Sequence, residues 1–145
     1  MKNSGRIATL FCVALVGCGG VSDRPELGYV EGTVTMDGQP VANATVIYQK
    51  SGARPSAAKT DADGYYELVY TDEVNGVALG THTVFITTFS EGDEDQEIAR
   101  QKETIPSQYN SSSELTADVV AGDQVIDFAL KSTGEIVELD DSVEE

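Results

Sequence analysis

The sequence has little of what catalytic and nucleic-acid-binding proteins need. It holds no tryptophan, one histidine, and 9 basic residues against 25 acidic ones. Because nucleic-acid affinity rests on lysine and arginine side chains that neutralise phosphates, this charge balance excludes a nucleic-acid partner. The two cysteines, Cys12 and Cys18, both lie near the start of the chain, so no disulfide can cross-link the remainder. Packing and strand pairing alone must therefore hold the fold.

Long hydrophobic runs are also absent. The longest, residues 7–16, has ten apolar or small residues including one threonine, and it follows the basic residues Lys2 and Arg6. A helix needs about 20 apolar residues to cross a bilayer, so this run is too short to span one. A basic start followed by a short apolar run is typical of a secretory signal peptide.

The run ends in a motif that matches the bacterial lipobox, formed by Leu15, Val16, Gly17 and Cys18. The small Gly17 suits a peptidase at the scissile bond, and the Cys18 thiol would carry a diacylglyceryl group before cleavage. Several buried acyl chains, such as palmitate, hold a protein firmly on a membrane, because each buried CH₂ contributes about 0.8 kcal/mol. The motif predicts a signal peptide over residues 1–17, lipidation at Cys18 and a flexible tether over 18–27.

The predicted address is an exported lipoprotein, anchored in the periplasm or at the cell surface. Gly19, rather than aspartate, follows the cysteine, which by analogy with Gram-negative sorting favours the outer over the inner membrane. Removing residues 1–17 takes two basic residues and no acidic one, which leaves a net charge of −18. Such an acidic protein adsorbs poorly to anionic lipid, so the lipid on Cys18 is the expected membrane contact.

After the tether, apolar and polar residues alternate with a period of two, and Gly-containing turns separate the runs. The alternation predicts a core that includes Val46, Leu68, Val84 and Phe128. Seven strands within about 100 residues are typical of an all-β sandwich, here a single domain over 28–131. The predicted strands are 28–36, 44–49, 57–60, 65–70, 81–88, 115–120 and 124–131.

Two acidic stretches interrupt this pattern. Residues 91–103 are predicted to form an acidic loop inserted between strands, and residues 132–145 to form an acidic, flexible tail. Several carboxylates in the loop could hold hard cations loosely, although a solvated loop is the simpler interpretation; they are Glu91, Asp93, Glu94, Asp95 and Glu97.

Residues 30–48, 59–68 and 76–86 together resemble the carboxypeptidase regulatory-like domain. The resemblance implies a seven-stranded, transthyretin-like (prealbumin-like) Greek-key β-sandwich. The family usually has proline where Leu79 stands and a core aromatic residue where His82 stands. The matching residues are Gly32, Val34, Asp37, Gly38, Pro40, Val41, Ala44, Val46, Thr60, Asp61, Gly64, Tyr66 (or Tyr65), Gly80 and Val84.

The candidate site residues are few, and each has a structural interpretation. His82 lies on the apolar face of its strand, so we expect a buried, structural histidine with a lowered pKa, and no Gly-x-Ser-x-Gly element accompanies it. Asp61 and Asp63 are weak candidates for calcium, but the further ligands of a calcium loop are missing, so we interpret them as a hairpin turn. Aromatic residues that could form a sugar platform are Tyr65, Tyr66, Tyr70 and Phe85.

These observations predict a non-enzymatic, lipid-anchored β-sandwich that serves the cell envelope as a structural or protein-interaction module and needs no cofactor. The alternative is an accessory module that binds carbohydrate or a divalent cation at the cell surface. Envelope proteins and glycans are the expected partners. The domain resemblance does not decide between these functions, because functions are carried by sites and not by folds.

Overall fold

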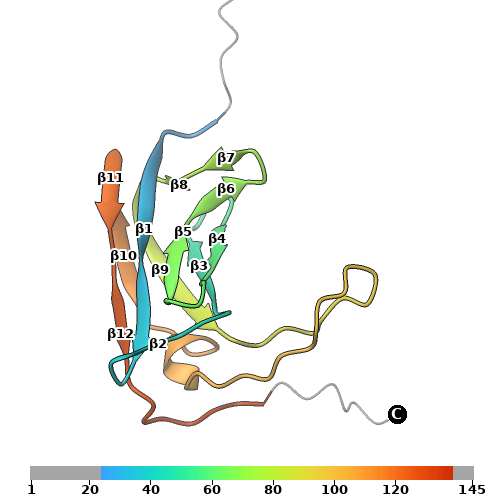
Figure 1. Cartoon of the computed structure of the whole chain (residues 1–145). Coiled ribbons are helices and arrows are strands. Elements are labelled where there is room, and N and C mark those ends of the chain that lie inside the picture. The colour runs from blue at the N-terminus through green and yellow to red at the C-terminus, as the bar shows by residue number, and fades with distance from the viewer. Residues whose placement is uncertain (1–23, 139–145) are drawn as a thin grey trace, which may run out of the picture.

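The computed structural model describes residues 24–138 and shows an all-β protein of two packed sheets (Figure 1). Twelve strands and a three-residue 3-10 helix, η1 (Ser107–Tyr109), make up its regular structure. No helix among the described residues is long and apolar enough to cross a membrane. The predicted signal peptide, the lipobox with Cys18 and the end of the acidic tail lie outside this range.

The first sheet is built around β1 (Leu27–Met36), the longest strand. On one edge, β1 pairs in parallel first with β11 (Gly122–Val125) and then with β12 (Phe128–Leu130). On its other edge it pairs antiparallel with three short strands: β2 (Gln39–Pro40), β5 (Tyr65–Glu67) and β8 (Val77–Ala78). Because β1 has partners along both edges, it is the central strand of this sheet.

The second sheet is antiparallel and has the order β10-β9-β3-β4-β6-β7. Its centre is the pairing of β3 with β9, which matches Thr45 with Thr87 and Tyr48 with Val84. The strands are β3 (Thr45–Gln49), β4 (Ser56–Lys59), β6 (Val69–Thr71), β7 (Val74–Asn75), β9 (Gly80–Thr87) and β10 (Thr116–Val119).

The core lies between the sheets and follows the predicted alternation. Val46, Leu68 and Val84 are fully buried and Phe128 is 9 % exposed, which confirms the predicted core. The phenol oxygens of Tyr48 and Tyr66 lie 3.2 Å apart in this core, and Tyr66 Oη donates to the carbonyl of Ile126 at 2.6 Å. Burial raises the pKa of Tyr48 to about 12, despite the opposing hydrogen bond with Tyr66. Burial also raises the pKa of Tyr66, so both hydroxyls stay protonated at neutral pH.

Two predicted strands are each divided in the structure. The predicted strand 65–70 is interrupted at Leu68, so that β5 pairs in the first sheet and β6 in the second. The predicted strand 124–131 is divided between β11 and β12, where the Ile126 N–H donates to the Glu31 carbonyl at 2.8 Å. A Cβ at Gly32 would overlap the Ile126 carbonyl oxygen, so glycine is what allows this close approach.

The acidic insertion forms a hairpin that stands away from the sandwich (Figure 1). Its stem carries the bridges Ser90–Gln101 and Asp93–Ile98, and its tip from Glu94 to Arg100 is exposed. Glu103, the last residue of the predicted loop, is buried rather than exposed to solvent, with only 8 % of its surface accessible. After β12 the chain runs beside η1, where the Ser107 N–H donates to the carbonyl of Glu135 at 2.7 Å.

Candidate functional site

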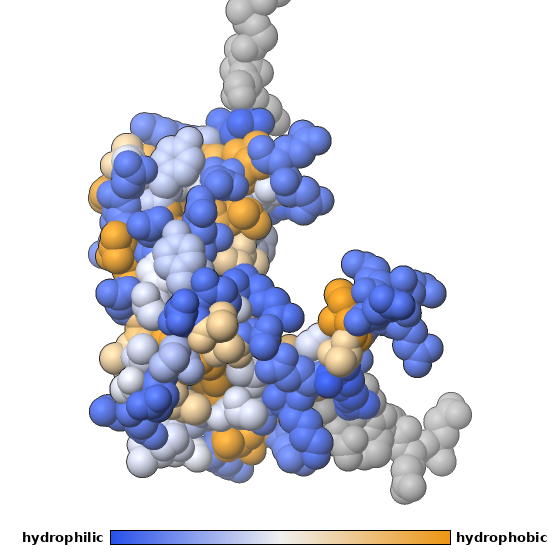
Figure 2. Space-filling model, in the orientation of Figure 1, coloured by the Kyte–Doolittle hydropathy of each residue, from blue (hydrophilic) through white to orange (hydrophobic). Residues whose placement is uncertain are grey.

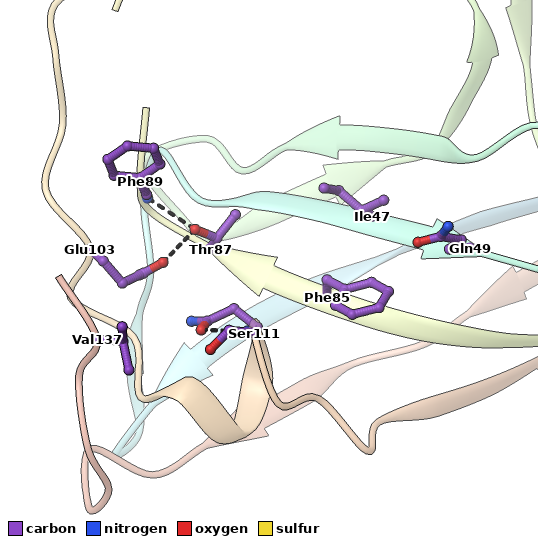
Figure 3. Close-up of a pocket in the computed structure, with 9 residues that line it drawn as sticks. Ile47, Gln49, Phe85, Thr87, Phe89, Glu103, Ser111 and Val137 are labelled. Carbon is purple, nitrogen blue, oxygen red and sulfur yellow. Dashed lines mark hydrogen bonds between the residues drawn. The ribbon is translucent and has the colours of Figure 1, made fainter. Parts of the chain in front are cut away.

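An apolar groove of about 330 Å³ lies on the outer face of the second sheet (Figure 3). Ile47 and Phe85 project into it from the paired strands β3 and β9. Phe89 and Glu103 lie toward one end, where the acidic hairpin leaves the sheet, and Val137 lies at the same end, on the other side of Glu103 from Phe89. The remaining lining residues are Gln49, Thr87, Asn110 and Ser111. Four segments distant in sequence therefore build one groove.

Glu103 is the hydrogen-bonding centre at that end of the groove. Its Oε1 accepts hydrogen bonds from the backbone N–H groups of Thr88 at 3.0 Å, Thr104 at 3.0 Å and Ile105 at 2.9 Å. Its Oε2 accepts a short hydrogen bond from the Thr87 hydroxyl, and the Thr88 hydroxyl lies 2.9 Å from Oε1. One carboxylate thus joins the end of β9 to the segment that returns from the hairpin.

The charged form of Glu103 is the favoured one. Burial alone would raise its pKa, but the hydrogen bonds from Thr87, Ile105 and Thr88 outweigh burial and hold the pKa below its ordinary value. Hydrogen bonds to a carboxylate stabilise its ionised state in this way. Glu103 is therefore a carboxylate at neutral pH.

The groove is suited to apolar side chains rather than to acid–base chemistry. Of its nine lining residues, Glu103 is the only ionisable one, and its oxygens already accept hydrogen bonds from the protein. A general base works best with a pKa near the operating pH, whereas the pKa of Glu103 is lowered. The groove can bind apolar side chains on Ile47, Phe85 and Phe89.

His82 lies inside the sandwich, as predicted, and is 1 % exposed. Its Nδ1 lies 3.0 Å from the carbonyl oxygen of Gly80, and its ring centroid is 5.9 Å from that of Tyr48. Its buried Nε2 has no hydrogen-bond partner within the described chain. Burial lowers the pKa of His82 and the charge of Lys50 adds to this, against the Gly80 hydrogen bond. The ring is therefore neutral at pH 7, with Nδ1 as the donor.

Asp61 acts as the cap of a turn. Its Oδ1 accepts from the N–H groups of Asp63 and Tyr65, both at 2.9 Å, so the turn uses this oxygen. Asp63 is exposed beside it. Within residues 24–138, no group of three or more histidine, cysteine or acidic side chains is arranged to hold a metal ion. In the hairpin, Asp93 likewise accepts from the backbone, through the N–H groups of Asp95 and Gln96.

The four aromatic residues considered for a sugar platform do not share a face. Tyr66 is 1 % exposed in the core. Tyr65 lies on the outside of the first sheet, whereas Phe85 lies on the outside of the second, in the groove. Tyr70, on β6, is half-buried. The prediction that these residues could form a single sugar-binding platform is therefore wrong.

Sequence reasoning missed Glu103 and Asn110 as parts of the groove. Asn110 anchors the turn after η1 by donating from Nδ2 to the Ile105 carbonyl at 3.0 Å. One signal could have found the groove. Ile47 and Phe85 each sit between two core residues, so both strands carry three consecutive apolar residues, a pattern of strands covered on both faces.

No protein-family model matches this chain, and no curated protein matches it.

Proposed function

We propose that this protein is an exported bacterial lipoprotein whose β-sandwich serves the cell envelope as a non-enzymatic structural or protein-interaction module. In this proposal the chain is cleaved before Cys18, lipidated there and held in the outer membrane. The lipobox at residues 15–18, behind a ten-residue apolar run, supports the address. The apolar groove on the second sheet and the buried, neutral His82 support an interaction role over a catalytic one.

The main structural support for the proposal is the position of the chain's entry into the sandwich. The chain enters at one end of the domain, and the hairpin and the adjoining end of the groove lie at the other. β1 starts at Leu27, nine residues after Cys18. Nine residues reach at most about 30 Å, so a lipid on Cys18 would keep the start of β1 near the membrane. The acidic hairpin leaves the opposite end of the domain (Figure 1). A lipid-anchored molecule would therefore present the hairpin and the adjoining end of the groove away from the bilayer.

The same proposal assigns the domain to the carboxypeptidase regulatory-like family, with its seven-stranded Greek-key fold. The motif residues have clear physical roles that support this assignment. The Thr60 hydroxyl accepts from the Ala44 N–H at 2.8 Å and donates to the Val41 carbonyl at 2.7 Å. Gly64 has a φ of +76°, and a Cβ there would overlap the Val34 carbonyl oxygen. Such motif positions specify a hairpin geometry rather than a ligand.

Membrane fractionation of a bacterial host tests the proposal. The wild-type chain should be found in the membrane fraction, and Cys18→Ala should be soluble or remain unprocessed. Cys12→Ala is the matched control, because it removes the other thiol of the same segment and should leave the distribution unchanged. Equal membrane association of wild type and Cys18→Ala, with identical apparent masses, would contradict lipid anchoring.

A further inference from the structure

A second groove, of about 340 Å³, lies on the outer face of the first sheet. Tyr29 and Glu31 project from β1, Glu67 from β5, and Asp123 and Val125 from β11. The other two lining residues are Val30 and Gln124. In Figure 2, apolar side chains in orange lie beside hydrophilic ones in blue over β1 and β11. This groove is separate from the one that Glu103 borders.

The strand register sets the order of side chains in this groove. Glu31 is directly opposite Glu67 on the antiparallel strand β5 and opposite Val125 on the parallel strand β11. Tyr29, the neighbour of Glu31 on the same face, is opposite Asp123. Each of the three strands therefore contributes a carboxylate to the groove, and the exposed Tyr29 and Val125 lie next to Glu31, on β1 and on β11.

The pairing of Glu31 with Glu67 is unfavourable in the free protein, because like charges directly opposite each other destabilise a sheet. Each carboxylate has one neutral donor: Tyr65 Oη donates to Glu31 Oε2 and Asn75 Nδ2 to Glu67 Oε1, both at 2.8 Å. None of the seven lining residues is basic. The hydrogen bond to Glu31 raises the pKa of Tyr65 to about 12, together with desolvation and the charges of Glu31, Glu67 and Asp61. The groove is thus a site of negative potential.

Exposed apolar surface accompanies this charge. Tyr29 is 53 % exposed and Val125 is 69 % exposed. A guanidinium or ammonium group is attracted to the face of a tyrosine ring, and the methylene stem of arginine or lysine covers aliphatic surface. A carboxylate also pairs with a guanidinium through two parallel hydrogen bonds. The groups that can make these three kinds of contact all line one groove.

We propose that the groove lined by Tyr29, Glu31, Glu67, Asp123 and Val125 binds an arginine- or lysine-bearing segment of a partner protein. The basic group lies between Glu31 and Glu67 and relieves their repulsion, while its stem packs on Tyr29 and Val125. A basic protein segment is favoured over a neutral sugar because a cation compensates the opposed carboxylates. It is favoured over a metal ion because these carboxylates do not form a metal-binding group. The net formal charge of −16 attracts such a partner at long range.

This inference deepens the proposed interaction role by giving the chemistry of the partner. Its test uses the purified full-length chain and a fluorescein-labelled octapeptide of alternating arginine and alanine, followed by fluorescence anisotropy. The matched probe carries citrulline, which is neutral and close in shape, in place of arginine. A neutral oligosaccharide and Ca²⁺ are titrated separately by calorimetry. The measurement needs no membrane, so its outcome is independent of lipidation at Cys18.

We expect the arginine probe to bind at micromolar concentration in low salt and the citrulline probe at least tenfold more weakly. The double variant Glu31→Gln with Glu67→Gln should weaken binding of the arginine probe at least tenfold, and Tyr29→Ala severalfold. The control is Glu91→Gln with Glu94→Gln, which removes the same charge from the exposed hairpin and should change affinity less than twofold.

Several results would overturn the inference. If the groove variant and the hairpin variant lost the same affinity for the arginine probe, binding would depend on net charge alone and not on the groove. Equal binding of the two probes would exclude recognition of a cationic side chain. Tighter binding of the oligosaccharide or of Ca²⁺ than of the arginine probe would assign the groove to the other ligand. Failure of the arginine probe to bind at low salt would remove the proposed site. Circular dichroism of each variant excludes unfolding as the cause of a loss.

Discussion

Removal of the Glu103 carboxylate should destabilise the domain more than removal of any exposed acid. In Glu103→Ala, the buried backbone N–H groups of Thr88 and Ile105 lose their acceptor. Each buried donor left without a partner costs about 1–3 kcal/mol, so we expect the two donors together to cost about 2–6 kcal/mol. In a domain of this size that loss lowers the melting temperature by roughly 10–20 °C.

Glu103→Gln separates the carboxylate's charge from its shape. The amide keeps one oxygen that can accept from the backbone, so the expected loss at pH 7 is smaller, about 1–2 kcal/mol. The folded-state pKa of Glu103 lies below its ordinary value. Its stabilisation is therefore complete above the ordinary glutamate pKa and is lost as pH falls toward the lowered one. The difference between wild type and Glu103→Gln should consequently shrink between pH 7 and pH 3.

Chemical denaturation at several pH values measures both effects. Glu94→Gln is the control, because Glu94 is exposed on the hairpin and surface substitutions usually change stability by less than about 0.5 kcal/mol. A loss of less than 1 kcal/mol in Glu103→Ala would contradict the role of the carboxylate as a buried acceptor. An equal difference in stability between Glu103→Gln and wild type at pH 7 and at pH 3 would contradict the lowered pKa.

Four further substitutions, at three positions, test the core. Phe128→Ala removes a ring that packs beside Tyr48 and Tyr66, so denaturation should show a loss of about 3–5 kcal/mol; a loss below 1 kcal/mol would disprove its place in the core. His82→Phe should melt at or above the wild-type temperature, since it removes the unpartnered Nε2, whereas His82→Asp should unfold the domain. Because burial lowers the pKa of His82, the wild type should gain stability as pH rises to about 6.5, and His82→Phe should lack this gain. Gly32→Val should prevent folding, seen as loss of cooperative melting, because a Cβ overlaps the Ile126 carbonyl.

The strand positions and the core follow from local patterns. Alternation along β3 and β9 places Val46 and Val84 in the core, and turn residues such as Asp61 mark where hairpins close. These signals depend only on residues that are neighbours in the chain, so the sequence alone is enough to predict the strands and the core. The prediction of a buried His82 succeeded for the same reason.

Features that depend on pairing between distant segments could not be read in this way. The division of the predicted strand 65–70 at Leu68 reflects a change of sheet, which its apolar alternation does not encode. Glu103 sits in an acidic stretch, and its burial depends on backbone N–H groups from two segments. The groove of Glu31 and Glu67 needs the register between β1 and β5, which pairs these two residues although they lie 36 positions apart in the chain.

The most direct test of the proposed lipoprotein is mass spectrometry of the protein extracted from its own membrane. The account predicts an N-terminal peptide that begins at Cys18 and carries a diacylglyceryl group. The measured mass of that peptide should exceed the mass calculated from its sequence by the mass of the lipid. Alkaline hydrolysis of the ester-linked acyl chains should then lower the measured mass. An unmodified N-terminus at any other residue, or an intact segment from Met1, would contradict the account.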